Sequence, residues 1–245
     1  MIDIHCHILP DVDDGSTSMD ESLEMARMAL MSGVTEIVAT PHFRGEPECL
    51  ERLPLIDQNY QALKEALERW RVPLKLHKGA EVLCTPQTLE LVQTGKLPTL
   101  GDSKYILTEF FFDETFSFME ECLFTLITSG YRPVVAHPER YHTIQRDPFR
   151  VLSLVNRDVA LQLNKGSLFG AFGDRAEKAA HDLLGLGFAH IIASDAHGCR
   201  SRTPDMGTLL DWAEECCDPE CTKMLLEENP RHILKNLPMV GFGDE

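Results

Sequence analysis

Long apolar runs and basic residues are what this sequence has least of. No stretch reaches the roughly 18 uninterrupted apolar residues that a transmembrane helix needs, and Met1 leads directly into a strand-like segment without a basic and then apolar leader. These absences predict a cytoplasmic protein that does not insert into a membrane. Only 23 Lys and Arg stand against 39 Asp and Glu, for a formal net charge of −16. Nucleic-acid binding depends on clustered basic side chains, so no nucleic-acid partner is expected.

Paired cysteine motifs are also missing. The chain has eight cysteines but no C-x-x-C motif, and in a cytoplasmic protein most of them are expected to be reduced thiols. Cys216, Cys217 and Cys221 form the one cluster, which we interpret as a helix end. A redox or metal role for this cluster stays open at the level of the sequence.

Short apolar runs alternate with longer amphipathic stretches along the whole chain. Seven runs are typical of strands, and they lie near residues 2–5, 35–40, 74–82, 105–112, 133–137, 159–164 and 190–195. Helices are predicted near residues 18–33, 54–71, 86–94, 117–129, 174–186, 205–217 and 219–235. This alternation predicts parallel strands covered by helices. No linker, charge block or repeat divides the sequence, so we expect one α/β domain over residues 1–245, a distorted TIM-like barrel of the (β/α)7 type.

The first strand-like run, in MIDIHCHILPDVDDG, carries two histidines separated by one residue. Alternate side chains of an extended segment share a face, so His5 and His7 point to the same side. Five further strand-like runs end in possible ligands, namely His42, Glu81, Glu109, His137, and Asp195 with His197. Each alone could be a helix cap, a loop charge or a buried histidine. Because active sites of barrels lie at the carboxyl ends of the strands, we expect these groups to converge.

The donor set contains nitrogen and oxygen but no thiolate, which suits Mn, Fe or Zn. So many histidines and carboxylates exceed the needs of one ion, and a cluster of two or three ions is expected. Metal ions about 3.5–4 Å apart can generate hydroxide at neutral pH and hold the oxygens of a displacement. The sequence therefore predicts a metal-dependent hydrolase.

Several motifs together resemble the PHP superfamily of polymerase-associated and histidinol phosphatases. They are HCH at 5–7, TPH at 40–42, Glu81, HPERY at 137–141 and SDAH at 194–197. Within that superfamily, HILPDVDDG, TEF, HPERY, LQLNKGSLFGAFG and DAHGCRSRTPDM are most similar to the bacterial metal-dependent tyrosine-protein phosphatases of capsule and exopolysaccharide operons. The likeness covers about residues 2–237.

The resemblance implies three metal positions, with manganese as the expected metal and iron or zinc as alternatives. The first would be held by His5, His7, Glu81 and Asp195. Glu81 would bridge to the second, held by Glu109 and His137, and the third would be held by Asp14, His42 and His197. Asp14 is chosen over Asp11 and Asp13 because it matches the family's D-D-G element. Arg140 and Arg202 would grip phosphate oxygens, with Arg200 as the alternative to Arg202.

The activity implied by the resemblance is hydrolysis of phosphotyrosine by in-line attack of metal-bound hydroxide on phosphorus. The expected partner is the phosphotyrosyl tail of a bacterial tyrosine kinase of capsule or exopolysaccharide synthesis, and homo-oligomer formation stays open. A thiolate mechanism is excluded, because no cysteine has the arginine six positions on that a C-x5-R loop requires. No general acid is identified. The acidic composition favours substrates with basic or uncharged flanks.

Three alternatives stay open. A small-molecule phosphatase of the histidinol-phosphate type would use the same metals in a narrower pocket, and a non-catalytic metal-binding regulator would sequester a kinase tail. An amidohydrolase would need a bridging carboxylated lysine, for which Lys165 is the candidate. The phenylalanines of the stretch EFFFDETFSF are expected to fill core and cover the mouth of the barrel. The alternative is a hydrophobic lip that stacks on the tyrosyl ring or meets another subunit, which substitution of Phe111 or Phe116 would test. The histidines interpreted as surface or structural are His77, His142, His181, His190 and His232.

Overall fold

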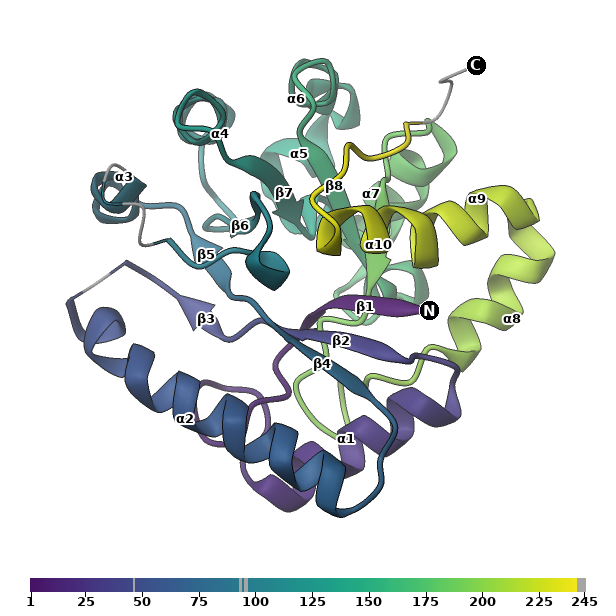
Figure 1. Cartoon of the computed structure of the whole chain (residues 1–245). Coiled ribbons are helices and arrows are strands. Elements are labelled where there is room, and N and C mark those ends of the chain that lie inside the picture. Colours follow the sequence, from purple (N-terminus) through teal and green to yellow (C-terminus); the bar gives the residue numbers. More distant parts are fainter. Residues whose placement is uncertain (46, 93, 95–96, 242–245) are drawn as a thin grey trace.

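The computed structural model describes residues 1–45, 47–92, 94 and 97–241 (Figure 1). Nine strands lie within these residues, in two parallel sheets. The first sheet has the order β1 (Ile2–Cys6), β2 (Glu36–Ala39) and β4 (Lys75–Lys78). The second has the order β3 (His42–Phe43), β5 (Glu81–Leu83), β6 (Tyr105–Glu109), β7 (Arg132–Ala136), β8 (Ala160–Asn164) and β9 (Ile191–Ala193).

Two of the predicted strands are each broken into two short ones. Thr40 and Pro41 separate β2 from β3, and Gly79 and Ala80 separate β4 from β5. Proline cannot donate to the strand ladder, and a Cβ on Gly79 would lie only 2.7 Å from a methyl group of Val38. After the two breaks, His42 and Glu81 are register partners at the start of the second sheet.

The two sheets together close into a ring. An isolated parallel bridge joins Cys6, at the end of β1, to Ala196, just after β9. Two backbone hydrogen bonds support it, from Asp195 N to His5 O and from His7 N to Ala196 O, each 2.9 Å. With the broken strands counted once, seven parallel strands follow one another in sequence order around the ring. The predicted barrel of the (β/α)7 type is confirmed.

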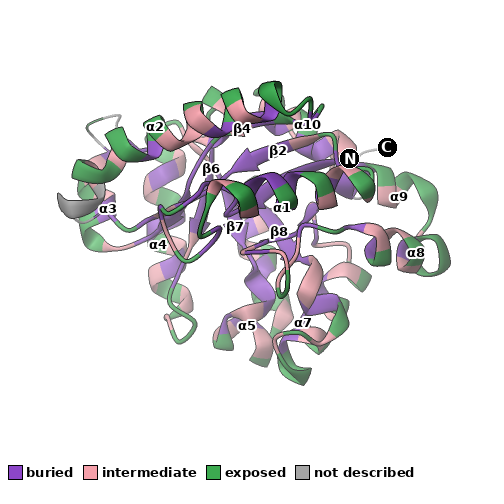
Figure 2. Cartoon of the chain, turned by 90° about the horizontal axis from the view of Figure 1, so that it is seen from below, coloured by how far each residue is buried: buried purple, intermediate pink, exposed green. Residues whose placement is uncertain are grey.

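Helices surround this ring, with buried inner and exposed outer faces (Figures 1 and 2). They are α1 (Met19–Met31), α2 (Pro47–Arg69), α3 (Pro86–Val92), α4 (Phe116–Thr128), α5 (His142–Arg146), α6 (Leu152–Val155), α7 (Asp174–Gly185), α8 (Gly207–Cys216), α9 (Pro219–Lys223) and α10 (Asn229–Leu234). Short 3-10 segments lie at Leu100–Asp102, Pro138–Arg140, Pro148–Val151 and Lys165–Phe169, and a π-helical turn at Met224–Glu228. Among the described residues, none of these helices is both long and apolar enough to cross a bilayer.

The helix predicted near residues 18–33 is confirmed as α1, whereas the helix predicted near residues 54–71 begins earlier. The Ser18 hydroxyl accepts from Glu21 N at 3.2 Å, and Gly33, at φ 90°, follows the helix end. The second helix begins at Pro47 rather than near residue 54, and Pro54 lies inside it. Asn229 and Pro230 begin α10, which continues α9 and the π turn, so these segments together fill the range 219–235 predicted as helical. Pro230 lacks the N–H that a regular α turn would use, and the π turn directly precedes it.

Apolar side chains from all parts of the ring fill its interior. Ile4, Val38, Leu107, Val134 and Ile191 come from five different strands and form one buried cluster. A larger cluster packs the outer face of the strands against the helices. The strand β1 carries a register irregularity between Asp3 and Cys6, and such bulges redirect side chains. The irregularity therefore lies in the strand that presents His5.

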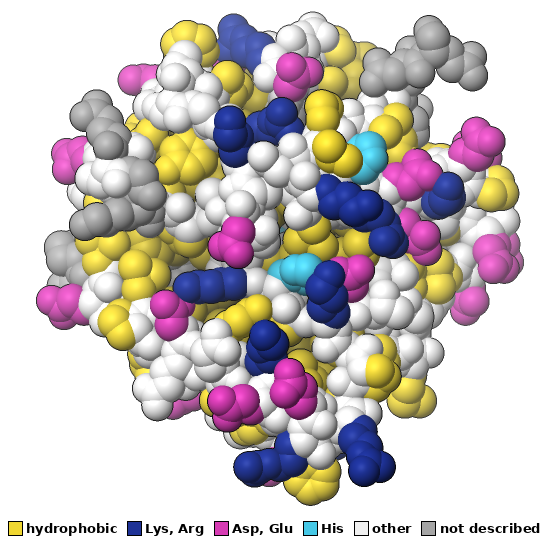
Figure 3. Space-filling model, in the orientation of Figure 1, with side chains coloured by type: hydrophobic (Ala, Val, Ile, Leu, Met, Phe, Trp, Pro, Cys, Tyr) yellow, Lys and Arg dark blue, Asp and Glu magenta, His cyan; other side chains and the backbone are white. Residues whose placement is uncertain are grey.

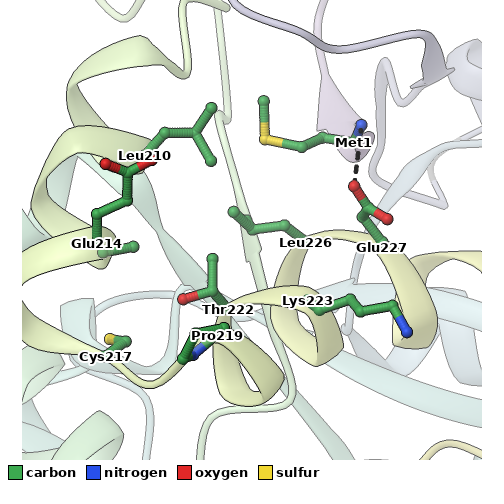
Figure 4. A pocket seen from close by; sticks show the side chains of 10 residues that line it. Met1, Leu210, Glu214, Cys217, Pro219, Thr222, Lys223, Leu226 and Glu227 are labelled. Carbon is green, nitrogen blue, oxygen red and sulfur yellow. Dashed lines mark ion pairs between the residues drawn. The ribbon is translucent and has the colours of Figure 1, made fainter.

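The cysteine cluster lies where α8 meets α9. Cys217 is the residue that follows α8, Cys221 belongs to α9, and both are free thiols. Cys217 also lines a cavity of about 320 Å³ between these helices and Met1, whose amino group is 3.8 Å from Glu227 (Figure 4). These positions agree with the interpretation of the cluster as a helix end.

Candidate metal centre

The nine residues predicted as ligands come together at the carboxyl ends of the strands. They are His5 and His7 in or after β1, Asp14 in the next loop, His42 in β3, Glu81 in β5, Glu109 in β6, His137 after β7, and Asp195 and His197 after β9. Backbone strain accompanies them, because His137 (φ 37°) and Asp195 (φ 49°) have left-handed conformations that non-glycine residues rarely adopt. Such strain is typical of functional sites.

The first predicted group is complete in the structure. Ligand atoms of His5, His7, Glu81 and Asp195 lie close enough to bind one ion. The Nε2 atoms of His5 and His7 are 3.3 Å apart, and each lies within 3.3 Å of one Glu81 oxygen, Oε2. All four side chains are at most 1% exposed. Burying four polar side chains so close together is costly unless they are paired or bind a cation.

The structure arranges the other two predicted groups differently, because His42, predicted for the third group alone, lies close to both. His42 Nε2 lies 3.3 Å from Asp14 Oδ1, as the third group requires, and His197 Nε2 lies 3.5 Å from the same oxygen. However, His42 Nδ1 also lies 3.0 Å from Glu109 Oε1. The predicted partner of Glu109, His137, faces the other Glu81 oxygen, Oε1, at 2.8 Å. The structure thus places His42 between the second and third groups.

Among the residues that the structure describes, three buried nitrogen and oxygen atoms of the candidate ligands make no hydrogen bond of good geometry, which tests whether a cation fits. They are Asp195 Oδ1, His42 Nδ1 and His137 Nδ1. Buried polar atoms are seldom left unpaired in native proteins, and such exceptions can mark an ion site. Imidazole and carboxylate donors suit Mn, Fe or Zn. The residues therefore fit divalent ions.

Electrostatic coupling within the group is strong. Burial alone would lower the pKa of His5, but Glu81 and Asp195 outweigh it and raise this pKa to about 9. Burial is likewise outweighed at His7, where Asp13 and Glu81 raise the pKa to about 10. In contrast, burial and the charge of His7 lower the pKa of His197 to about 4. In the metal-free protein at neutral pH, His5 and His7 therefore carry protons.

Metal affinity is accordingly expected to rise with pH. An ion must displace the protons of His5 and His7, since only neutral imidazole binds metal. Between pH 6 and pH 8 the affinity for Mn²⁺ should increase by up to about tenfold per pH unit for each proton released. The stability of the metal-free fold has the opposite trend, because folding raises the pKa values of His5 and His7. Their protonation stabilises the fold fully below about pH 6.5, and this stabilisation is lost as the pH rises toward 9–10. Calorimetric Mn²⁺ titrations in buffers of different ionisation enthalpy measure the protons released, and an affinity independent of pH would contradict the expectation.

Three residues outside the predicted ligand set orient the candidate ligands. Asp13 Oδ2 lies 2.7 Å from His7 Nδ1, and Gln162 Oε1 lies 2.8 Å from His5 Nδ1. Asn164 Nδ2 donates to Asp195 Oδ2 at 2.5 Å. Asp13 stood beside Asp14 in DVDDG, and the LQLN run places Gln162 and Asn164 on one face of β8. Partners of this kind fix the ring orientation of metal-binding histidines.

Replacing Asp13 with alanine should weaken metal binding without removing a ligand. Loss of such a partner typically costs about 10- to 100-fold in metal affinity, and Asp13 also accepts from His42 N at 3.1 Å. We expect a rise of this size in the Kd for Mn²⁺, measured by calorimetry. Asp11 belongs to the same loop but to none of the groups of ligand atoms, so Asp11→Ala is the matched control. Equal Mn²⁺ affinity in the two variants would rule out this role of Asp13.

Both predicted arginines reach the donor set. Arg202 Nη2 lies 2.6 Å from Asp195 Oδ2, and Arg140 Nη1 lies 3.6 Å from the same oxygen. The guanidinium of Arg140 also lies over the rings of Phe112 and Phe172, at 4.5 and 4.2 Å from their centroids. Both arginines line a cavity of about 320 Å³ together with ligand residues, whereas the alternative, Arg200, lines a neighbouring cavity.

The aromatic stretch divides between core and mouth. Phe110 is buried and Phe116 packs against the core, whereas Phe111 and Phe112 are 55% and 43% exposed and line the same cavity as the ligands. Tyr141 holds this loop, since its hydroxyl donates to Ala136 O and accepts from Phe110 N. Phe111 therefore lies where a lip could form, whereas Phe116 packs against the core.

The lysine required by the amidohydrolase alternative lies elsewhere. Lys165 Nζ donates to the carbonyl oxygens of Thr203 and Asp205, at 2.7 and 2.5 Å. Both contacts are with a loop rather than with the ligand groups, so Lys165 does not bridge this centre.

A parallel ring of strands with histidine and carboxylate ligands gathered at their carboxyl ends defines the class of α/β barrel proteins with a candidate metal centre. Its fold is similar to that of an organophosphorus hydrolase mutant from Deinococcus radiodurans, with a TM-score of 0.62 at 15% identity over 95% of this chain and 92% of that one. The family model for capsular polysaccharide synthesis, CpsB/CapC, matches residues 1–235. The chain belongs to the CpsB/CapC family.

Relatives of known name agree with this membership. The chain is 36% identical to the tyrosine-protein phosphatase YwqE of Bacillus subtilis, over 96% of this chain and 92% of YwqE. It is 33% identical to the tyrosine-protein phosphatase CpsB of Streptococcus pneumoniae, over 96% and 98% of the two chains. A solved structure from work on YwqE and CpsB, described as metal-dependent tyrosine phosphatases, has a TM-score of 0.85 at 33% identity and covers 99% of this chain and 97% of that chain.

Proposed function

We propose that this chain is a metal-dependent protein-tyrosine phosphatase that hydrolyses the phosphomonoester of a phosphotyrosyl protein. The observation that carries the proposal is the position of Asp195. One of its oxygens belongs to the first ligand group, while the other lies against Arg140 and Arg202. Groups that can hold cations and groups that can grip a phosphate therefore adjoin in one cavity.

Each part of the chain has a role in this proposal. The nine candidate ligands would hold two or three divalent ions, manganese first and iron or zinc as alternatives. Ions bound there supply Lewis acidity, which activates water and polarises phosphoryl oxygens. Arg140 and Arg202 bind the non-bridging oxygens as charge builds up on them. Phe112 and Phe172 hold Arg140 in place by stacking on its guanidinium.

The cavity also bears on the leaving group. Among the described residues that line it, every carboxylate and every imidazole belongs to the candidate donor set. None is therefore left over as a general acid. A tyrosine phenolate, with a pKa near 10, leaves with less protonation than an alkyl alkoxide does. This favours phosphotyrosine over histidinol phosphate as the substrate.

The biological substrate we infer is the phosphotyrosyl tail of a tyrosine kinase that acts in capsule or exopolysaccharide synthesis, met in the cytoplasm. The support is family membership, since the matched family belongs to capsular polysaccharide synthesis. We infer that residues 1–245 act as one catalytic domain.

The test combines metal analysis with activity. Purified protein is assayed on p-nitrophenyl phosphate, a phosphotyrosyl peptide and histidinol phosphate, before chelation, after chelation and after return of Mn²⁺. We expect activity on the first two substrates, its loss with the chelator and its recovery with Mn²⁺, and little inhibition by vanadate. Activity that survives full metal removal would refute the metal mechanism. A preference for histidinol phosphate would favour the small-molecule alternative, and metal binding without turnover would favour the non-catalytic regulator.

A further inference from the structure

A second cavity adjoins the candidate site and shares Phe112 and Arg140 with it. Its volume is about 600 Å³. We call it the flanking cavity; its other lining residues come from α5 and from the start of α7, and they are His142, Gln145, Phe172, Gly173, Asp174, Arg175 and Ala176.

The charges of the flanking cavity are mainly basic and only partly paired. Arg140 lies 3.6 Å from Asp195. By contrast, in the part of the chain that the structure describes, neither Arg175 nor His142 has a carboxylate within ion-pair distance. Asp174 is the one carboxylate in the lining. An exposed guanidinium without a protein partner, beside a proposed phosphate site, is available to an anion from outside.

The start of α7 adds to this preference. The preceding residue, Gly173, caps the helix without a side-chain hydrogen bond, and a Cβ placed on it would meet no atom within 4 Å. The first backbone N–H groups of a helix lack intrahelical partners and favour anions. The open space at Gly173 leaves room for such a group beside Arg175.

We propose that the flanking cavity is an anion subsite, which binds a carboxylate or a second phosphoryl group carried by the peptide next to its phosphotyrosine. The inference rests on the proposed function, because the phosphotyrosine places the peptide at the mouth. Arg175 and His142 provide the contacts, and Arg140, which lines both cavities, adds a positive charge beside them.

The overall charge of the chain does not oppose such a subsite. A net charge of −16 favours basic or uncharged flanks only at long range, and the Debye length at physiological salt is about 8 Å. On the one face of the molecule that Figure 3 shows, acidic and basic side chains are interspersed, so the net charge does not form one continuous acidic surface there. Local pairs with Arg175 therefore decide the preference within the cavity.

The experiment measures binding, so that it does not depend on turnover. Peptides carry a non-hydrolysable phosphonate analogue of phosphotyrosine, and either glutamate or phosphoserine replaces alanine at successive positions on each side. Their Kd for the Mn²⁺-loaded protein is measured by fluorescence anisotropy. We expect one position at which glutamate tightens binding roughly two- to fivefold and phosphoserine about tenfold, with the gain reduced at high salt.

Variants locate the effect. Arg175→Ala should abolish the gain, so that the acidic and the alanine peptides bind with about the same Kd. In Arg175→Glu the acidic peptide should bind more weakly than the alanine peptide. Arg146 is exposed on α5 and does not line the flanking cavity, so Arg146→Ala should keep the gain. Circular dichroism of each variant checks that it is folded. A scan without a favoured position, or a gain that survives in folded Arg175→Ala, would overturn the subsite.

Turnover of p-nitrophenyl phosphate by the same preparation is measured separately. It reports on the proposed function alone. A preparation that is inactive on this substrate but shows the position-dependent gain would support the subsite and contradict the phosphatase. A preparation that is active on p-nitrophenyl phosphate, but binds all peptides of the series with the same Kd, would support the phosphatase and contradict the subsite.

Discussion

Replacing Glu81 with glutamine is expected to lower kcat by more than about 100-fold, the upper end of the typical cost of losing a residue that only supports a metal ligand. Its two oxygens face different groups, since Oε2 lies against His5, His7 and His42 while Oε1 lies against His137. Glutamine keeps the shape but loses the charge, and it offers one oxygen instead of two. The measurement is steady-state turnover of p-nitrophenyl phosphate together with metal content.

The control for Glu81 is a carboxylate at the amino-terminal end of the strands. Glu36 begins β2 and pairs with Lys75 and His77 at 3.2 and 2.8 Å. Glu36→Gln should retain both metal and activity. Full metal content and normal turnover in Glu81→Gln would remove Glu81 from the centre.

Exchange of Arg202 for lysine is the second change with a large expected effect. It should lower kcat about 100- to 1000-fold, which is the typical cost of one lost transition-state donor. Lysine keeps the charge but not the planar fork that grips two phosphate oxygens. Metal content should be unchanged, because Arg202 contacts Asp195 through an oxygen that is outside the first ligand group. Kinetics on p-nitrophenyl phosphate measure the effect.

Arg200 is the matched comparison for Arg202, because it lies in the same loop and was the alternative from the sequence. It lines the neighbouring cavity and not the one that holds the candidate ligands. Arg200→Lys should therefore keep its kcat. If Arg200→Lys lowered kcat more than Arg202→Lys did, the assignment of Arg202 would be wrong.

The class of fold and the location of the site could be predicted from the sequence, because most of the predicted strands end in a histidine or a carboxylate. The alternation of short apolar runs with amphipathic stretches gave seven strands, and His, Asp or Glu ended six of them. Local patterns suffice for this result, since parallel strands share one direction and their ends must meet at one edge. The HCH spacing placed His5 and His7 on one face for a similarly local reason.

Other features depend on contacts between distant segments, which local patterns do not contain. Gly79 ends β4 because the side chain of Val38 approaches it closely. Gln162 supports His5 across 157 positions of sequence, and an isolated LQLN run gives no sign of this partner. Pro230 is tolerated within a helical run because a π turn precedes it. In each case tertiary structure overrides the local signal.

The closure of the ring between Cys6 and Ala196 has a consequence for biogenesis. His5 and His7 leave the ribosome first, but Asp195 and His197 follow only after the other strands have been made. A growing or shortened chain that stops before residue 195 thus lacks Asp195, one of the four residues of the first group, and His197 of the third. A complete set of metal ligands therefore exists only once the polypeptide is finished, and a product that terminates early would lack phosphatase activity.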